Sequence, residues 1–314
     1  MDLIRQVTDA SARDCVVTIG TFDGLHLGHQ ALIERLLWHA RECALPATML
    51  SFEPMPREIL QPDDPPARLT NFRERWRLLQ GSGLARLCLL RFDRVRCLSA
   101  LEFMQLLAAM RARRVVVGHD FRFGHGGEAD VEWADAHAAQ FGLAFDVVSP
   151  VLLNGERISS GLVRGALAAG DLSRAGRLLG RTYGMRGRVL PGARLGRTLG
   201  FPTANVAVRR RRVPLQGIFA VRVNGPGLVR WPGVASLGMR PMVGGTVPLL
   251  EVHLFDFAGD LYGREIEVEF VGKLRDEQMF VSLDAMVEQI HRDARQARAL
   301  LDAAAPDAAA VRGT

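Results

Sequence analysis

The strongest constraint on the fold is a change of pattern near residue 183. Before it, short apolar runs rich in β-branched residues alternate with amphipathic stretches of helical period, as in βαβ units. The apolar runs lie near residues 15–19, 47–52, 86–90, 114–118 and 144–148. We therefore predict an α/β domain over residues 1–182, with a doubly wound parallel sheet and ligands at the C-terminal ends of its strands.

Beyond residue 183 the helical period fades, and short strands separated by Gly and Pro follow. Residues 265–270 alternate charged and apolar side chains, and similar segments lie near residues 217–223, 233–238 and 249–255. The pattern favours an antiparallel β-barrel over a sandwich for residues 183–303, closed by a terminal helix at about residues 282–301. Residues 304–314 are low in complexity and are predicted to be disordered.

Composition narrows the class of protein. The chain has 314 residues, 48% of them hydrophobic, which is enough for two domains with sizeable cores. It contains no run of about 18 apolar residues and no signal-peptide layout, so we expect a cytoplasmic protein without a membrane segment. Its four cysteines lie far apart and form no C-x-x-C pair, which argues against a disulfide scaffold or a zinc knuckle.

The charge balance favours anionic ligands. Forty Lys and Arg against 34 Asp and Glu leave a net charge of +6, which suits nucleotides but is too scattered for a dedicated nucleic-acid protein. The one dense basic run comprises Arg209, Arg210, Arg211 and Arg212. We interpret this run as a solvated loop, with phosphate steering or nucleic-acid binding as the alternatives.

A segment with two histidines follows the first predicted strand. Residues 20–30 read GTFDGLHLGHQ and connect that strand to a helix. Free backbone N–H groups in the first helical turn favour an anion, and His26 and His29, three residues apart, can face it together. A zinc pair is the rival interpretation, but no acidic or cysteine ligand stands at metal-site spacing. Phosphate binding explains the pair better than a metal or a purely structural role.

Two further segments of the first half have the chemistry of a nucleotide site. Residues 118–124 place Phe121 and Phe123 around an arginine at a strand end, so they either line a pocket for a planar ring or belong to the core. Ser159 and Ser160 precede a predicted helix, with Arg164 one turn later. These serines either cap the helix or form a second phosphate clamp with Arg164.

The second half contains a loop dense in glycine at residues 192–205. No Walker A sequence occurs in the chain, so this loop does not indicate a P-loop kinase. Thr203 and Asn205 supply the hard oxygen ligands that Mg²⁺ prefers. A turn-rich hairpin without a ligand is the alternative. The phosphate-binding residues predicted in this loop are Gly192, Gly196, Arg197, Gly200, Pro202, Thr203 and Asn205.

Glu251 is an unusual residue for the start of an apolar strand. Carboxylates are depleted in strands, so a glutamate at the start of the predicted strand 251–255 suggests a general base for a hydroxyl group. The alternative is a surface residue on an edge strand. His253 points to the same side, where it is more typical of a core or edge residue than of a catalytic one.

Seven short motifs occur in one order between residues 14 and 295. They read GTFDGLHLGHQ, SFEPMPRE, GHDFRFG, RISSGLVR, GRTLGFPTAN, EVHL and DLYG. In this order they resemble the bacterial bifunctional riboflavin kinase and FMN adenylyltransferase family, also called FAD synthetases. The resemblance implies a Rossmann-like nucleotidyltransferase domain that makes FAD from FMN and ATP, and a C-terminal riboflavin kinase barrel.

The resemblance also implies roles for individual residues. His26 and His29 would act on the triphosphate, Thr203 and Asn205 would hold Mg²⁺ and phosphate, and Glu251 would be the catalytic base. The implied ATP site of the first domain comprises Gly20, Thr21, Phe22, Asp23, His26, His29, Ser159, Ser160 and Arg164. The implied flavin site comprises Gly118, Asp120, Phe121, Arg122 and Phe123. Riboflavin, FMN and ATP with Mg²⁺ are the expected small-molecule partners, and we expect a monomer or a weak homo-oligomer.

Several residues depart from the family pattern. Met55 stands where a histidine is usual, Gly161 replaces a threonine, and the segment after Gly124 lacks an arginine. In the kinase half, Ser236 and Met242 stand where asparagine and threonine are usual. We therefore keep one alternative, a riboflavin kinase with an attenuated adenylyltransferase domain, and a remote one, a nucleic-acid-binding protein.

Overall fold

The computed structural model describes residues 1–6, 13–192, 200–242 and 245–304. The chain divides into two compact units. The first comprises Met1–Pro66 and Arg75–Ser159, and the second comprises Ala67–Glu74 and the chain from Ser160 onward. A functional division at residue 182 stays a prediction. The predicted disordered tail lies outside the described residues, apart from Ala304 at the end of the last helix.

The first unit is an α/β domain with one parallel sheet. Its strands run in the order β1-β4-β3-β2-β5-β6, and all neighbouring strands are parallel. The strands are β1 (Asp2–Ile4), β2 (Cys15–Ile19), β3 (Ala47–Phe52), β4 (Arg86–Leu90), β5 (Ala112–Gly118) and β6 (Ala144–Val148). The main helices are α2 (Leu27–Glu42), α3 (Pro56–Leu60), α5 (Phe92–Val95), α6 (Ala100–Ala109) and α7 (Val131–Ala138), and helix α4 (Phe72–Leu79) has its last five residues in this unit. Short elements complete it, namely the 3-10 turns η1 (His125–Gly127) and η2 (Ala139–Phe141) and the hairpin β7 (Leu152–Leu153) with β8 (Glu156–Arg157).

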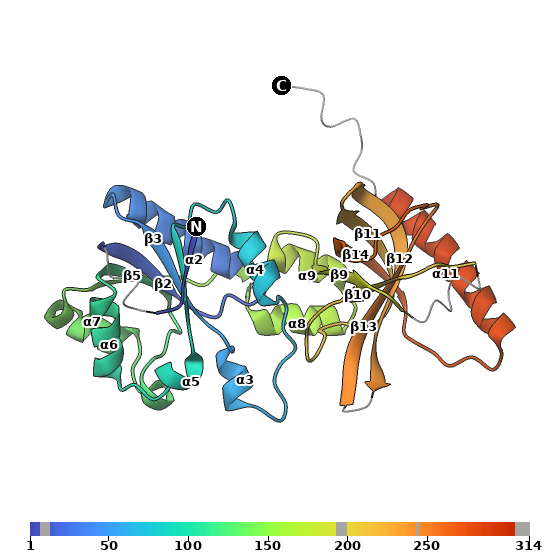
Figure 1. Cartoon of the computed structure of the whole chain (residues 1–314). Coiled ribbons are helices and arrows are strands. Elements are labelled where there is room, and N and C mark those ends of the chain that lie inside the picture. The colour runs from blue at the N-terminus through green and yellow to red at the C-terminus, as the bar shows by residue number, and fades with distance from the viewer. Residues whose placement is uncertain (7–12, 193–199, 243–244, 305–314) are drawn as a thin grey trace, which may run out of the picture. The chain divides into compact units, whose positions relative to one another are not determined.

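Both faces of the central strands are covered. Every residue of β2 and β3 is buried, as expected for strands with helices on either side (Figure 1). On one face, Phe103, Met104 and Leu107 of α6 pack with Val17 and other inward residues of the sheet. The predicted doubly wound fold is confirmed.

The second unit is a closed antiparallel barrel. Its strands close in the order β10-β13-β12-β11-β14-β9. They are β9 (Gly184–Leu190), β10 (Ala204–Ala207), β11 (Gly217–Gly225), β12 (Leu228–Met242), β13 (Gly245–Leu254) and β14 (Glu265–Arg275). Helices α8 (Ser160–Ala168) and α9 (Leu172–Leu179) precede the barrel, and α11 (Leu283–Ala303) follows it. Ala297 and Leu301 of α11 pack on Ala220, Val234 and Phe255, so the predicted terminal helix covers the outside of the barrel (Figure 1).

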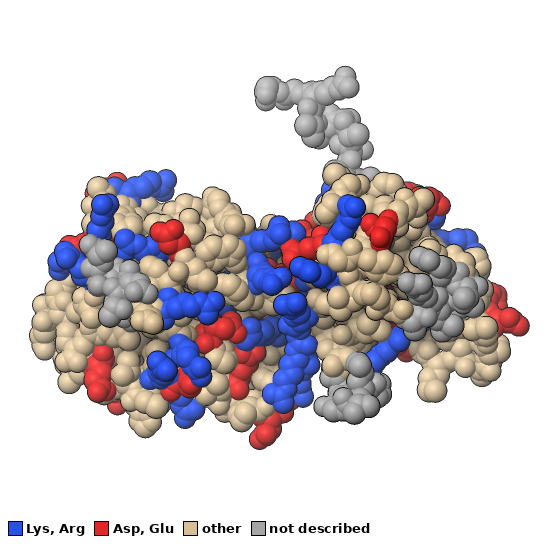
Figure 2. Space-filling view, in the orientation of Figure 1, with Lys and Arg blue, Asp and Glu red and all other residues tan. Residues whose placement is uncertain are grey.

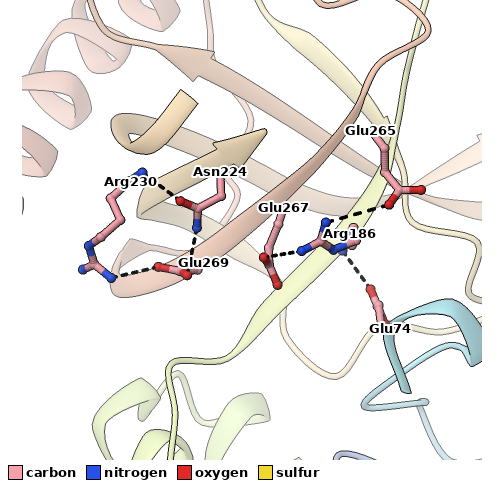
Figure 3. Close-up of polar contacts among 7 residues, drawn as sticks. All are labelled: Glu74, Arg186, Asn224, Arg230, Glu265, Glu267 and Glu269. Carbon is pink, nitrogen blue, oxygen red and sulfur yellow. Dashed lines mark hydrogen bonds and ion pairs between the residues drawn. The ribbon is translucent and has the colours of Figure 1, made fainter. Parts of the chain in front are cut away.

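A short segment distant in sequence also belongs to the second unit. Glu74, at the end of Ala67–Glu74, accepts a hydrogen bond of 2.8 Å from the backbone N–H of Arg186 on β9 (Figure 3). Its other carboxylate oxygen lies 2.5 Å from the guanidinium of Arg210, and the Tyr183 hydroxyl donates to the Leu69 carbonyl at 3.0 Å. These bonds fasten the segment to the barrel.

Charged residues also line the outer face of β14. Arg186 pairs with Glu267 at 2.6 Å and with Glu265 at 3.8 Å, while Glu269 accepts from Asn224 at 3.0 Å (Figure 3). This row explains the alternating charged pattern predicted for residues 265–270, because the intervening side chains of β14 are buried.

The interpretation of the arginine run as a solvated loop is wrong for Arg210. Its side chain has no exposed surface and is bonded to Glu74 and to the carbonyl oxygens of Arg68 and Leu69. Acidic and basic side chains are interspersed on the face drawn in Figure 2. Arg209, Arg211 and Arg212 are exposed, so the solvated-loop interpretation holds for these three residues.

Candidate active sites

The loop between β2 and α2 has an unusual backbone. Phe22 and Leu25 adopt φ angles of 51° and 45°, in the left-handed region that non-glycine residues rarely occupy. The Thr21 carbonyl accepts hydrogen bonds from Arg75 Nη1 at 2.8 Å and from Ser51 Oγ at 3.4 Å. Gln30 donates to the Leu25 carbonyl at 2.9 Å. Contacts from outside the loop thus fix a conformation that the local sequence disfavours.

The two histidines of this loop stack on each other. Their ring centroids are 3.7 Å apart with an interplanar angle of 19°. His26 is the N-cap of α2, and its Nδ1 accepts a hydrogen bond of 3.3 Å from the backbone N–H of His29. The expectation of free N–H groups throughout the first turn is therefore wrong at His29 and Gln30, because the His26 carbonyl accepts hydrogen bonds from both, at 2.8 and 3.0 Å.

His29 has the environment of a neutral imidazole. Burial is the main cause that holds its pKa well below the usual 6.5, and the charges of His26 and Arg75 act in the same direction. Its Nδ1 is buried and has no hydrogen-bond partner within the described part of the chain. The neutral ring can offer one N–H donor and one acceptor to a ligand.

The other predicted ATP residues are divided between the two units. A Cβ atom at Gly28 would lie 3.2 Å from the His26 ring and 3.5 Å from the Ile158 carbonyl, so the segment before Ser159 reaches the histidine loop. Asp23 and Phe22 are both buried, and the Phe22 ring lies 5.1 Å from that of His29. Ser160 begins α8 with Arg164 one turn later, and both belong to the second unit.

The predicted flavin segment has one aromatic in the core. Gly118 ends β5, and Phe123 is buried against Phe103 with ring centroids 5.4 Å apart. Phe121 stacks on Phe123 at 5.4 Å and is only partly buried. The other two side chains have polar partners, since Asp120 pairs with Arg157 and Arg122 donates to the Gly127 carbonyl at 3.1 Å.

In the barrel, strand register brings the predicted kinase residues together. Asn205 on β10 is the direct partner of Glu251 on β13, which is in turn the partner of Ser236 on β12. Directly paired residues place their side chains on the same face of a sheet. Val206 and Val252 point the other way into the buried interior, so Asn205 and Glu251 share the outer face.

Gly192 shows how closely Asn205 is held. A Cβ atom there would lie 2.7 Å from Asn205 Cγ, which is closer than real Cβ contacts allow. Gly200, also predicted, sits in a turn at φ 82° with open space around it. Gly196 and Arg197 lie outside the described residues. Of the two predicted barrel glycines that the structure describes, Gly192 is the one that makes room for a functional side chain.

Glu251 and His253 lie two residues apart in β13, on its outer face. Glu251 Oε2 lies 2.7 Å from Arg240 Nη2, which orients the carboxylate. His253 Nδ1 lies 2.9 Å from the Pro202 carbonyl oxygen, so that nitrogen must carry the proton and donate it. His253 is thus an anchor for the chain beside Thr203.

A cavity opens beside this segment. Its volume is about 380 Å³, within the range of about 300–1,000 Å³ usual for small-molecule sites. Pro202 and Thr203 line one side, and Leu254, Phe257 and Tyr262 contribute apolar surface. Apolar surface of this kind suits a planar ring system, and Thr203 adds a polar residue to the lining.

The donor atoms in the barrel suit Mg²⁺. Thr203 directly precedes β10 and Asn205 is the second residue of that strand, so two side-chain oxygens lie close together in the chain. Mg²⁺ prefers oxygen ligands completed by water and phosphate. Within the described ranges, no group of three or more His, Cys, Asp or Glu side chains is arranged to hold a metal. A site of this kind would share its ion with a nucleotide.

Comparison with known proteins identifies the class of each half. The family model described as FAD synthetase matches residues 8–162, and the one described as riboflavin kinase matches residues 179–301. A Pseudomonas fluorescens bifunctional riboflavin kinase/FMN adenylyltransferase is 47% identical over 94% of this chain and 95% of its own length. The Escherichia coli K12 protein of the same name is 45% identical over the same shares. The chain belongs to the bifunctional riboflavin kinase/FMN adenylyltransferase family.

A solved structure has the same architecture over nearly the whole chain. It is titled as a macrolide-efflux protein from Streptococcus pneumoniae, is 31% identical and has a TM-score of 0.82. The match covers 95% of this chain and 99% of the other. None of the helices in the described ranges is both long and apolar enough to cross a membrane.

Sequence reasoning missed some residues around the sites. Nothing in the helical pattern of α4 distinguishes the buried Arg75 from its exposed neighbour Arg77. The hydrogen bond between His253 and the Pro202 carbonyl was also missed. The two-residue spacing of Glu251 and His253 had already placed both side chains on one face of the strand. That spacing was the signal that could have found it.

Proposed function

We propose that this chain catalyses both reactions in its family name. The barrel unit would phosphorylate riboflavin to FMN with MgATP, and the α/β unit would transfer AMP from ATP to FMN, giving FAD and pyrophosphate. The observation that carries this proposal is the 45–47% identity over 94% of the chain to proteins named for both activities. The geometry of the two candidate sites supports it.

For the kinase, Glu251 is the proposed general base. Its carboxylate would accept the proton of the terminal ribityl hydroxyl as that oxygen attacks the γ-phosphorus of ATP and ADP departs. Asn205 faces Glu251 across one strand pair, so the base and the phosphate ligands share a surface. Thr203 and Asn205 would hold Mg²⁺, which neutralises phosphate charge when bound. The cavity beside Thr203 would take a substrate ring.

For the adenylyltransferase, no covalent intermediate is needed. An oxygen of the FMN phosphate would attack the α-phosphorus of ATP, and pyrophosphate would leave. The neutral ring of His29 would donate an N–H to a phosphate oxygen as charge moves toward the leaving group. We propose that Gly20, Thr21 and Ser159 contribute further phosphate contacts within this unit. A part for Ser160 and Arg164, which belong to the second unit, stays a prediction. Phe22 and Asp23 are buried and would act by shaping the loop.

For the flavin, Phe121 is the proposed contact. It keeps exposed surface, whereas Phe123 supports it from the core. Gly118, Asp120 and Arg122 flank this ring and would meet the polar edge or phosphate of FMN.

Product analysis tests the function directly. The purified chain should convert riboflavin and MgATP to FMN and then FAD, separated by chromatography. Absence of FMN would reject the kinase. The kinase-only alternative predicts FMN without FAD. Its support is Gly161 and Met55, of which Met55 is buried. FAD formation from added FMN separates that alternative from a slow first step.

A further inference from the structure

Arg75 is a completely buried arginine that the proposed mechanisms do not use. It lies in α4, and its side chain has no exposed surface. Arginine is rarely buried to this extent unless it is paired, because removing a charge from water is unfavourable. Its neighbours Arg73 and Arg77 in the same helix are both exposed. The position of Arg75 therefore needs an explanation that helix stability does not give.

The guanidinium joins two chain segments beside the histidine loop. Nη1 donates to the Thr21 carbonyl at 2.8 Å, and Nη2 lies 3.2 Å from Glu53 Oε2, just beyond the end of β3. Glu53 offsets the buried charge, while Thr21 receives a charge-assisted hydrogen bond. The two bonds point in fixed directions because the guanidinium is planar.

The bond to Thr21 acts at a strained position. The Thr21 carbonyl belongs to the peptide unit that precedes Phe22, whose φ of 51° lies in the left-handed region. Such a conformation persists only where surrounding contacts over-determine it. Ser51 also reaches this carbonyl, but at 3.4 Å, so Arg75 makes the shorter contact. The ring of Phe22 in turn lies 5.1 Å from that of His29.

We propose that Arg75 is a positioning residue of the adenylyltransferase, which holds residues 20–25 in the shape that receives a nucleoside triphosphate. The proposal rests on the proposed function of the first unit. Arg75 does not touch substrate; it acts through the Thr21 carbonyl. The positive charge of Arg75 is also one of the causes that lower the pKa of His29, which is consistent with a place just behind the loop.

The role predicts a specific kinetic signature. Without Arg75 the loop would populate other conformations, so ATP binding would have to restore the competent one and its apparent affinity would fall. Losing a hydrogen bond to a charged group weakens an affinity by about 10- to 150-fold. For Arg75→Met we expect KM for MgATP in FAD synthesis to rise by about that factor, with kcat changed less than about threefold. Arg75→Lys retains the charge and one bond and should show a smaller rise.

The controls separate this role from a general loss of structure. Arg77→Met changes an exposed arginine of the same helix and should leave KM near the wild-type value. FMN formation, measured on the same samples, should be unchanged in all three variants. If Arg75→Met also loses FMN formation, the KM for MgATP of Arg75→Lys tests the proposal in its place. A KM in Arg75→Met equal to that of Arg77→Met, with normal FMN formation, would overturn the proposal.

A second readout does not depend on turnover. Titration of His29 by NMR should give a higher pKa in Arg75→Met than in the wild type, and no comparable rise in Arg75→Lys. An unchanged pKa in Arg75→Met would count against the proposed placement of the charge. A wild-type chain that forms no FAD would reject the proposed function instead, while this titration still tests Arg75.

Discussion

The two candidate sites are built in different ways. In the α/β unit, the site depends on a loop with left-handed residues, held by Arg75 and Ser51 from other parts of the chain. In the barrel, Asn205 and Glu251 meet because their strands pair in register. A strand pair fixes its side chains through the backbone ladder, whereas a strained loop relies on single side chains. Substitutions outside the substrate contacts should therefore affect the first site more than the second.

The largest effect should come from Glu251→Gln. Removing a general base lowers a rate by about 10²- to 10⁴-fold, so FMN formation should fall by that factor. Conversion of added FMN to FAD should stay within about twofold of wild type, since that reaction belongs to the other unit. Both rates are measured by chromatography of the products. Equal losses in the two activities would argue against separate sites.

His29→Ala should have the opposite selectivity. It removes a donor to a phosphate oxygen, for which we expect a loss of about 10- to 150-fold in FAD synthesis. Riboflavin phosphorylation in the same sample serves as the control and should not change. A variant that retains full FAD synthesis would exclude His29 from the site.

Gly192→Ala tests how the barrel site is held. The added Cβ would lie 2.7 Å from Asn205 Cγ, and overpacking of this kind costs about 1–3 kcal/mol. If Asn205 moves in response, FMN formation should fall by about 5- to 150-fold. Gly176→Ala is a matched control, because its Cβ would meet the nearest atom at 3.7 Å. Equal kinase rates in the two variants would show that the position of Asn205 is not critical.

The partly buried His29 also predicts a pH dependence of stability. Its pKa is lowered on folding, so the unfolded chain binds the proton more readily once the pH falls below about 6.5. Acidification from pH 7 should therefore destabilise the α/β unit, by up to about tenfold in the unfolding constant per pH unit. Denaturant midpoints measured at several pH values should show a shallower decline in His29→Gln. The same slope in both proteins would contradict a neutral imidazole at His29.

The smallest effect is expected for His253→Ala. The variant loses one neutral hydrogen bond to the Pro202 carbonyl, a change of about 0.5–1.5 kcal/mol or roughly 2- to 10-fold in KM for MgATP of the kinase. His253→Asn can still donate a hydrogen bond and should recover much of the loss. If both variants behave alike, the bond does not position Thr203.

The sequence predicted the elements better than the contacts between them. Apolar runs located β2 and β3 at their observed bounds, because a buried parallel strand is apolar throughout. The short strands β1 and β10 were missed, since three or four residues give no measurable period. The motifs also marked His29 and Glu251, but the burial of Arg75 and Arg210 depends on tertiary pairing that no local pattern records.

The central claim is that the chain holds two independent sites, and mixing two variants tests it most directly. Glu251→Gln supplied with riboflavin and MgATP should make little FMN, and His29→Ala should stop largely at FMN. A mixture of the two should form FAD at a rate well above the sum of the separate samples, because FMN released by one chain is adenylylated by the other. A mixture that forms no more FAD than that sum, although each variant keeps its remaining activity, would contradict the account.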